Sequence, residues 1–377
     1  MENPFIFGEI VEQRHFVDRE QELENLIRDM ADGQKVFLLS PRRFGKSSLV
    51  SVAFIKLRKR RLRTAIVPVS SYSTYAQFLE KFAERVIRAA GPWERARNWI
   101  TAFLRNVQPQ VTLNPTSGEI SLGLNPGAKS DPAAVAGEVF AMPGDLAKKG
   151  GFRMAICLDE SQQISIFNGG TVENVLRNEV QRQRDVGYVF SGSQPSLMEA
   201  MLSSGRPFHK AGPSVFLDKI SAEAWRQFIS AQFSSIRVKL SDSAVDHLLA
   251  AADLVPYDVQ RIAHELWDYA QLNRKGSIGL PDVEFVIEEL VKGQSDYFER
   301  LWEQLSLRQR ALLQALAERG PSALLSQTVR EEYRLGPAST VQKALQSLDS
   351  QDILDRYRAA YFFLDPLFAI WARKSIQ

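Results

Sequence analysis

The sequence predicts an α/β protein in which a parallel β-sheet carries helices on both faces, followed by a helical domain and a small domain with a β-wing. Three observations predict this fold. Up to residue 220, short apolar runs alternate with helical segments, which is typical of parallel sheets. From 221 onward the pattern is helical, and aromatic residues suited to a hairpin follow near the C-terminus. We therefore expect three domains, at 1–220, 221–293 and 294–377.

Composition agrees with a globular protein of two or three domains. The 377 residues are 45% hydrophobic and 24% charged, as expected for a chain with a sizeable core. The sequence lacks both an apolar run of roughly 20 residues and a signal region, so we expect a cytoplasmic protein without membrane contact. One cysteine, Cys157, and four scattered histidines argue against a disulfide and against a Cys- or His-built metal site. A net charge of +3 means that any nucleic-acid binding must be local.

The first predicted element is an amphipathic helix at 20–31, with Leu23, Leu26, Ile27 and Met30 on one face. The segment before it could lie over a ligand held by the loop that follows. It could equally cap the domain without touching a ligand.

A strand at Val36–Leu39 runs through a short loop into a helix that opens with Lys46 and Ser47. This arrangement directs backbone N–H groups and a positive helix end at one point, which suits a polyphosphate. It matches the P-loop pattern G-x-x-x-x-G-K-[ST], except that Ser40 replaces the first glycine. The pattern predicts that Lys46 reaches the β/γ-phosphates and that Ser47 binds Mg²⁺. The alternative is an ordinary strand-turn-helix. The expected phosphate-binding residues are Ser40, Pro41, Arg42, Arg43, Phe44, Gly45, Lys46, Ser47 and Ser48.

The helix after this loop ends in the densest basic run of the chain, Lys56–Arg63. A helix C-terminus favours cations through its dipole, so the run can be a solvated helix end, with nucleic-acid contact as the alternative. A strand at 64–70 and helices at 75–90 and 93–107 follow. Alternating apolar residues around 114–118 predict a β-hairpin, which we interpret as an insertion near 109–126, before a helix at 131–149.

The apolar run Met154–Leu158 is typical of a central parallel strand, and Asp159 and Glu160 follow it directly. Ligands bind such sheets beyond the strand C-termini. We expect Asp159 to hold Mg²⁺ through its hydration shell, and Glu160 to orient the attacking water, with Lys46 assisting catalysis. A helix at 174–184 precedes a strand at 186–190 that ends in 191–194, which places Ser193 beside the γ-phosphate. Simple turn chemistry is the alternative for that stretch.

The remaining chain is predicted to be helical at 222–234, 241–252, 256–273 and 282–292, and then at 297–305, 306–319, 324–333 and 338–349. With a hairpin near 357–364, the last part suits a winged helix-turn-helix, whose third helix can enter a major groove. Exposed polar residues of that helix are Ser339, Thr340, Gln342, Lys343 and Gln346. From residue 294 the chain has 11 Lys/Arg and 10 Asp/Glu. This nearly neutral net charge is weak support for DNA binding, so docking to a protein is an equal alternative.

Together these residues resemble the archaeal-type ATPases of the STAND and AAA+ P-loop NTPases, which are initiator-like and end in a winged helix. The matching pieces are residues 3–5 and 16–20, the loop at 40–47, and then 158–160, 192–193 and Pro256-Tyr257. The resemblance covers nearly the whole chain. The resemblance implies a helical lid over the nucleotide, and it implies that Pro256 of this lid contacts the nucleotide. The chain departs from the usual pattern of these ATPases at two places. Ser40 replaces a glycine, and residues 254–256 stand where Gly-x-Pro is usual.

The resemblance also implies roles for two arginines. Arg261 matches a sensor arginine, and Arg206 lies in the loop before the expected fifth strand, 213–217. Related ATPases use an arginine there on a neighbouring subunit's phosphoryl group, so a homo-oligomer is expected if Arg206 acts in this way. A solvated loop arginine is the alternative.

The sequence thus predicts a P-loop ATPase that acts as a molecular switch. ATP and Mg²⁺ bind, Glu160 supports hydrolysis, and ATP or ADP sets the state of a winged helix that binds DNA or a protein partner. Two further functions stay open: an ATP-binding regulator with little turnover, and a DNA-binding initiator or loader.

Overall fold

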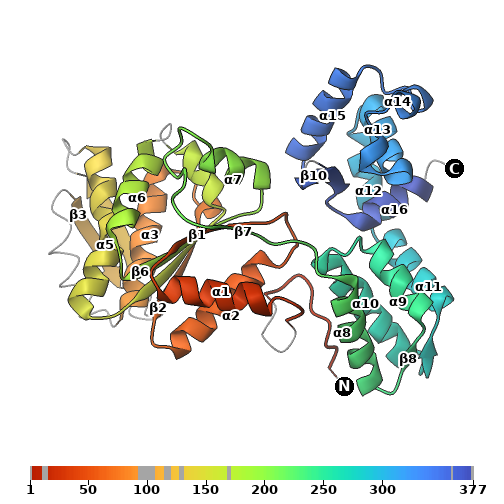
Figure 1. Ribbon diagram of the computed structural model, residues 1–377, viewed down its shortest axis with the longest axis horizontal. Coiled ribbons are helices and arrows are strands. Elements are labelled where there is room, and N and C mark those ends of the chain that lie inside the picture. Colours follow the sequence, from red (N-terminus) through yellow and green to blue (C-terminus); the bar gives the residue numbers. More distant parts are fainter. Residues whose placement is uncertain are drawn as a thin grey trace. The chain divides into compact units, whose positions relative to one another are not determined.

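The computed structural model describes residues 2–10, 16–91, 107–113, 120–126, 131–167, 171–357 and 360–374. The chain forms two compact units (Figure 1). Unit 1 contains residues 1–18, 41–45 and 218–377, and unit 2 contains 19–40 and 46–217. The chain therefore leaves unit 2 at Ser40 and re-enters it at Lys46, within the predicted phosphate-binding loop. The separation of residues 221–293 from 294–377 as two domains stays a prediction.

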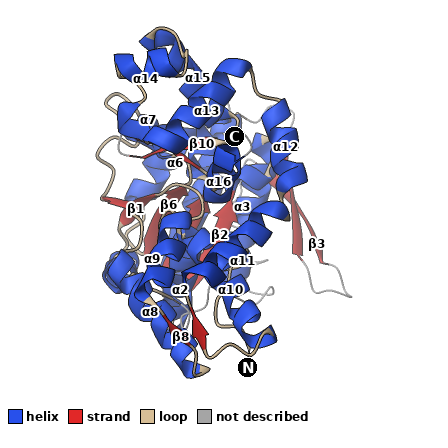
Figure 2. Cartoon of the chain, turned by 90° about the vertical axis from the view of Figure 1, so that its right-hand side faces the viewer, coloured by secondary structure: helices blue, strands red, loops and turns tan. Residues whose placement is uncertain are grey.

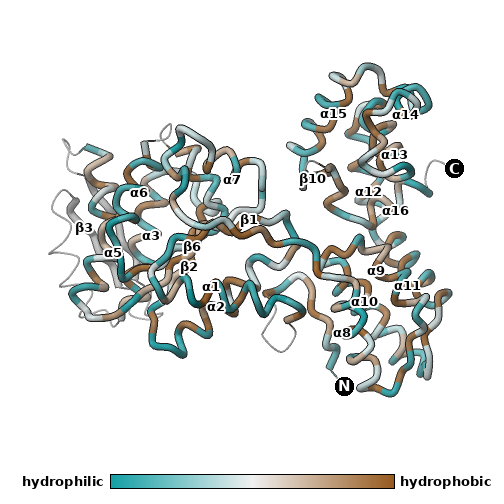
Figure 3. The backbone as a smooth tube through the Cα atoms, in the orientation of Figure 1, coloured by the Kyte–Doolittle hydropathy of each residue, from teal (hydrophilic) through white to brown (hydrophobic). Residues whose placement is uncertain are grey.

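Unit 2 is built on the predicted parallel sheet of five strands. β1, β5 and β6 are short, apolar segments, and brown stretches run through the sheet in Figure 3. β1, β5 and β6 are almost completely buried, as a sheet covered on both faces requires. The order across the sheet is β2 (Arg63–Pro68), β5 (Met154–Asp159), β6 (Val186–Gly192), β1 (Lys35–Leu39) and β7 (Ser214–Phe216).

Helices cover both faces of this sheet (Figure 1). α1 (Glu20–Ala31) and α2 (Lys46–Lys59) contact one face. The other face packs in one apolar cluster with α3 (Tyr75–Ala90), α5 (Pro132–Gly150), α6 (Thr171–Arg182) and α7 (Pro195–Leu202). Alternate strand residues point to opposite faces. Phe37 and Phe190 share one face and stack with ring centroids 4.9 Å apart. Short 3₁₀ turns lie at Val69–Ser71 and Ser161–Ile166.

A separate hairpin lies between α3 and α5. β3 (Val107–Leu113) and β4 (Ile120–Pro126) pair antiparallel and form a two-stranded sheet of their own. The turn at 114–119 lies outside the described residues. The helix expected at 93–107 also lies outside them, apart from Val107, which begins a strand instead.

Residues 222–292 of unit 1 contain four helices that follow the sequence prediction closely. They are α8 (Ala222–Ser235), α9 (Asp242–Ala251), α10 (Pro256–Leu272) and α11 (Leu280–Lys292). The prediction of helices alone was wrong in one respect. β8 (Lys239–Leu240) and β9 (Ser277–Ile278) pair in parallel. Strands of two residues are too short to leave an alternating pattern in the sequence.

The C-terminal part of unit 1 is mainly helical and ends with a β-hairpin and one more helix (Figure 2). The hairpin starts at Leu354, three residues before its expected start, and the helix α16 was not predicted. Buried residues of both parts of unit 1 belong to one continuous core. Among the described residues, no helix is long and apolar enough to cross a membrane. The elements are α12 (Ser295–Glu303), α13 (Leu307–Arg319), a 3₁₀ turn (Pro321–Ala323), α14 (Gln327–Glu332), α15 (Ala338–Ser350), β10 (Leu354–Tyr357), β11 (Ala360–Phe363) and α16 (Pro366–Lys374).

Candidate nucleotide-binding site

The carboxyl edge of the sheet in unit 2 brings Lys46 together with the two predicted carboxylates. Lys46 is the first residue of α2, and only 7% of its side chain is exposed. Its Nζ lies 3.3 Å from Asp159 Oδ1 and 3.0 Å from Glu160 Oε1. About a quarter of each carboxylate side chain remains exposed, at 26% and 23%. The site therefore holds a buried cation beside two anions that solvent can still reach.

Glu160 is held in one orientation by several donors. Its Oε2 accepts hydrogen bonds from Ser193 N at 3.1 Å, from Ser193 Oγ at 2.7 Å and from Gln162 Nε2 at 2.6 Å. The backbone at Glu160 has φ 54° and ψ 43°, a left-handed conformation that is uncommon outside glycine. Such strain concentrates at functional sites. Burial favours a higher pKa for Glu160, but Lys46 and the hydrogen bonds from Ser193 and Gln162 outweigh it, so the pKa is lowered.

Asp159 is anchored from the neighbouring strand β6. Ser191 Oγ donates to Asp159 Oδ1 at 2.6 Å and lies 3.4 Å from Cys157 Sγ. Burial, followed by the negative charge of Asp159, raises the pKa of the Cys157 thiol to about 12. Cys157 is thus a buried, protonated core residue rather than a nucleophile.

The donors at this edge fit a magnesium ion shared with phosphates. In proteins Mg²⁺ is usually held by one or two carboxylates, with water and phosphate oxygens completing its shell. Asp159 and the exposed Ser47 supply that small donor set. The described residues contain no cluster of three His, Cys, Asp or Glu side chains that could hold a metal by itself.

The other predicted loop residues divide between the two units. Ser40 is buried in unit 2, and its N–H donates to the Gly192 carbonyl oxygen at 3.3 Å. Ser48 is also buried in unit 2. Residues 41–45 belong to unit 1. Gly45 has φ 87°, so the glycine of the motif is required by the backbone.

Within unit 1, the arginines of the loop are paired with carboxylates. Arg42 Nη1 lies 2.6 Å from Asp352 Oδ2, and both side chains are largely exposed. Arg43 Nη1 donates to the Leu364 carbonyl oxygen at 3.1 Å and lies 3.4 Å from Asp365 Oδ2. Asp352, Leu364 and Asp365 all belong to the segment predicted to be a winged helix. Residues 42 and 43 of the loop are thus joined to that segment by two ion pairs.

Arg43 also contacts α10, the helix that Pro256 opens. The Tyr257 N–H donates to the Arg43 carbonyl oxygen at 3.3 Å, and the Arg43 guanidinium lies 4.7 Å from the centroid of the Tyr257 ring. Arg43 Nη1 is 3.8 Å from Oδ2 of the fully buried Asp258. Neither Asp258 oxygen has a hydrogen-bond partner in the described part of the chain. Burial, reinforced by Asp365, raises the pKa of Asp258 to about 7.

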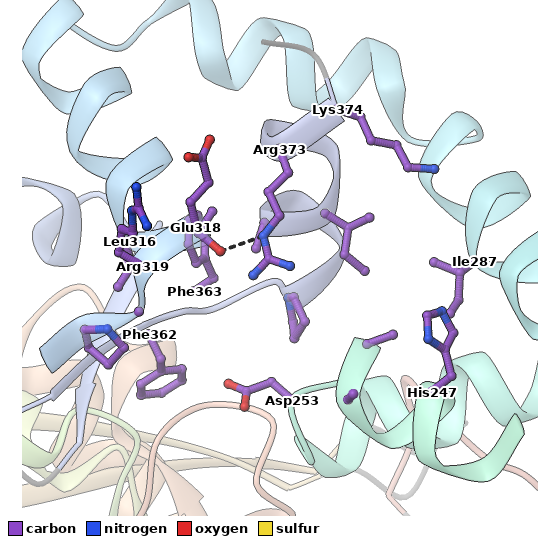
Figure 4. A pocket seen from close by; sticks show the side chains of 18 of the residues that line it. His247, Asp253, Ile287, Leu316, Glu318, Arg319, Phe362, Phe363, Arg373 and Lys374 are labelled. Carbon is purple, nitrogen blue, oxygen red and sulfur yellow. Dashed lines mark hydrogen bonds between the residues drawn. The ribbon is translucent and has the colours of Figure 1, made fainter. Parts of the chain in front are cut away.

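Two cavities in unit 1 adjoin these loop residues. One of about 500 Å³ is lined by Arg42, Arg43 and Arg261, with aromatic side chains beside them. The other, of about 1230 Å³, is lined by Phe44 and by side chains of α9 and α16 (Figure 4). Four Lys/Arg and four Asp/Glu side chains line it, among them Lys374, whose Nζ lies 2.7 Å from Glu288 Oε1. Three arginines and two aspartates line the first cavity, so its lining carries a small net positive charge, unlike that of the second.

Arg206 lies elsewhere in unit 2 and is held by a buried carboxylate. Its Nη2 is 3.0 Å from Oε2 of Glu173, whose side chain is fully buried. Burial raises the pKa of Glu173, and Arg206 opposes that rise. This pairing gives Arg206 a structural partner that sequence reasoning missed. Gln162 was missed as well, because nothing but its place after Glu160 distinguishes it.

Comparisons with known proteins agree with this architecture. Residues 296–374 match a family described as a probable winged helix domain. The Walker-type ATPase PABY2304 of Pyrococcus abyssi is similar in structure, with a TM-score of 0.65, 17% identity, and coverage of 98% of this chain and 99% of that one. No curated protein matches in sequence.

Two ORC proteins of Aeropyrum pernix are also similar. The ORC2 protein, solved with ADPNP and ADP, has a TM-score of 0.58 at 14% identity, covering 99% of this chain and 96% of its own. The ORC1 protein, solved with DNA, has a TM-score of 0.50 at 15% identity, with coverage of 96% and 93%. At these identities the likeness concerns the fold. The predicted resemblance is confirmed at that level: this chain has the fold of the Walker-type ATPase PABY2304 and of the two ORC proteins, with a C-terminal winged helix domain.

Proposed function

We propose that the protein is an ATPase that works as a nucleotide-dependent switch, with ATP and Mg²⁺ bound at the loop of residues 40–48. One observation carries this proposal: all three loop cations are held by carboxylates. Lys46 pairs with Asp159 and Glu160 in unit 2, whereas Arg42 and Arg43 pair with carboxylates of unit 1. A polyphosphate carries more negative charge than a single carboxylate and also forms charge-assisted hydrogen bonds, so bound nucleotide would compete for these cations.

The residues of unit 2 have separate roles in this proposal. Lys46 would turn from the carboxylates to the β/γ-phosphates. Asp159 and Ser47 would hold Mg²⁺, which neutralises charge on the phosphate oxygens. Once Lys46 has turned away, Glu160 loses the main opposing charge that lowers its pKa, and its basicity rises. A more basic Glu160 is better suited to orient and polarise the attacking water.

The residues of unit 1 would transmit the change. When a phosphate draws Arg42 and Arg43, the ion pairs with Asp352 and Asp365 are lost, and the winged helix domain is released from the loop. After hydrolysis and product loss the pairs re-form. The winged helix domain would then expose or withdraw a surface for its DNA or protein partner in step with the nucleotide.

Phosphate release under steady-state conditions tests the enzymatic part. The wild type should turn over ATP, and Glu160→Gln should bind ATP with little change while losing about 10²- to 10⁴-fold in turnover, because an amide is a poor proton acceptor. Asp159→Asn should instead weaken the Mg²⁺ dependence of binding. Glu199→Gln, the same substitution at an exposed acid of α7, serves as the matched control.

Two outcomes would redirect the proposal. If the wild type binds ATP tightly but turns over no faster than Glu160→Gln, the protein is a nucleotide-binding regulator and not an ATPase. If Asp159→Asn and Glu160→Gln change binding and turnover alike, the proposed division of roles is wrong.

A further inference from the structure

The opposite edge of the sheet in unit 2, where the strands begin, carries a cluster of exposed cations that the proposed ATPase does not use. α2 ends there, a turn at residues 60–62 follows, and β2 starts at Arg63 (Figure 1). Leu57 is buried and anchors this turn, because the Leu62 N–H donates to its carbonyl oxygen at 3.1 Å. The basic side chains of this turn are Lys56, Arg58, Lys59, Arg60, Arg61 and Arg63.

The start of β5 extends the cluster. The Arg63 N–H donates to the Arg153 carbonyl oxygen at 2.9 Å, so the two arginines open neighbouring strands. Arg63 lies over the Phe152 ring, 5.9 Å from its centroid. Two further exposed lysines, Lys148 and Lys149, belong to the last turn of α5, just before Phe152. We call the cations of residues 56–63 together with Lys148, Lys149 and Arg153 the basic edge.

Much of this charge is not neutralised by carboxylates of the chain. Lys59, Arg60 and Arg61 are exposed, and none of them forms an ion pair within the described ranges. Arg58 donates to a hydroxyl group, Thr64 Oγ1, at 2.9 Å. Two exposed carboxylates supply negative charge here: Asp185 precedes the neighbouring strand β6, and Asp145 interacts with Lys148. Like charges this close together repel, so the cluster gains from a polyanionic partner.

We propose that the basic edge binds the phosphate backbone of a nucleic-acid duplex. Five of its nine cations are arginines, whose planar guanidinium matches the oxygens of a phosphate. An anionic membrane is a poorer fit, because little apolar surface could enter a bilayer: Leu57 is buried, Leu62 is half-buried, and Ile55 is 38% exposed. The third helix of the winged helix domain, α15, carries a single cation, Lys343. The basic edge therefore provides more phosphate contacts than that helix does.

This interaction is independent of nucleotide turnover, and it should be strongly salt-dependent and indifferent to base sequence. Each neutralised phosphate contributes about 0.9 to the slope of log K against log salt. Loss of three contacts should reduce that slope by nearly 3. It should also weaken binding on the order of 100-fold at about 0.1 M salt.

The test is fluorescence anisotropy of a labelled duplex of about 24 base pairs, with the full chain and without nucleotide. Lys59→Glu, Arg60→Glu and Arg61→Glu are combined in one variant. A matched control combines Arg237→Glu, Lys239→Glu and Arg274→Glu, three exposed cations around β8 and β9 that lack a carboxylate partner among the described residues. We expect the first variant to lose affinity and slope, and the control to stay within about 3-fold of the wild type.

Several outcomes would overturn the proposal. The first is an equal loss of duplex affinity in the triple variant of the basic edge and in its matched control, and the second is no loss of affinity in either. The third is that the protein binds vesicles with phosphatidylserine but does not bind the duplex. A loss of duplex affinity in the Lys343→Glu variant alone would assign the binding to the winged helix domain instead. Arg60→Gln with Arg61→Gln removes charge without reversing it, and thermal unfolding identifies any misfolded variant. Lys46→Ala should bind the duplex normally, so a failure of the ATPase proposal and a failure of this one are distinguishable.

Discussion

The two edges of the sheet in unit 2 carry charge in opposite ways. At the carboxyl edge, Lys46 is buried and paired with Asp159 and Glu160. Hydrogen bonds from serine hydroxyls of residues 191 and 193 hold these two carboxylates in place. At the amino edge, Lys59, Arg60 and Arg61 are exposed and lack a carboxylate partner among the described residues. Oriented, paired charges suit the positioning of one ligand atom by atom, whereas a field of solvated cations suits any polyanion. The difference predicts a specific nucleotide site at one edge and a sequence-independent surface at the other.

The largest expected effect is a difference between two lysine substitutions, one at each edge. Lys46→Ala should weaken ATP binding by about 1000-fold or more, because charge-assisted hydrogen bonds to two phosphates are lost. Lys59→Ala should leave ATP affinity unchanged. Calorimetric titration measures both. Similar affinities for the two variants would remove the distinction between the edges.

Unit 1 also contains both kinds of charged group: the carboxylate of Asp258 is buried, whereas that of Asp352 is exposed. Burial and the charge of Asp365 raise the pKa of Asp258 to about 7, although Arg43 and Arg261 oppose the rise. The folded state therefore binds one more proton than the unfolded state between about pH 4 and 7. Stability should therefore fall as pH rises through this window and level off above it. Asp258→Asn should lessen that fall by about 3 kcal/mol relative to the wild type between pH 5 and pH 8. The part due to Asp355, whose pKa burial also raises to about 7, should remain in the variant.

Thermal unfolding at both pH values tests this expectation. Glu289→Gln, an exposed acid on α11, is the control and should follow the wild type at each pH. A wild type whose stability does not fall between pH 5 and pH 8 would show that Asp258 is ionised at an ordinary pKa.

A smaller effect is expected at Arg206, which the sequence offered as a catalytic finger for a neighbouring subunit. Removing it leaves the buried Glu173 without its cation, so Arg206→Ala should destabilise the protein by about 2 to 3 kcal/mol. Turnover per chain should not depend on protein concentration in either form. A concentration-dependent rise that Arg206→Ala abolishes, at unchanged stability, would restore the finger role and a working homo-oligomer.

The smallest effect is expected at the exposed pair of Arg42 and Asp352. Exposed ion pairs contribute at most about 1 kcal/mol, so Arg42→Ala should hardly change the unfolding temperature. A loss well above that value would mean that the loop is part of the structural core of unit 1, and not a releasable contact.

Sequence reasoning succeeded where the signal is local. The apolar runs gave the central strands, and the loop that ends in Gly45-Lys46-Ser47 sits between a strand and a helix, as its motif requires. It also placed Asp159 and Glu160 at the edge where Lys46 lies, since parallel strands end at a common edge.

What could not be predicted depends on contacts between distant parts of the chain. Arg43 and Asp365 are separated by 322 residues, and no pattern near either of them indicates the other. The left-handed backbone at Glu160 and the pairing of Glu173 with Arg206 likewise depend on the packed structure. The helix α16 was missed because it is nine residues long and follows directly on the wing.

The central claim is that nucleotide phosphates and the carboxylates of the winged helix domain compete for the same loop arginines. Titration of Mg²⁺-ATP into the double variant Asp352→Asn and Asp365→Asn tests it most directly, with Glu289→Gln as the control. Because the competing charges are gone, ATP should bind the double variant roughly 3- to 10-fold more tightly than the wild type, while the control should be unchanged. Unchanged or weaker binding by the double variant would contradict the claim and separate the winged helix domain from the nucleotide.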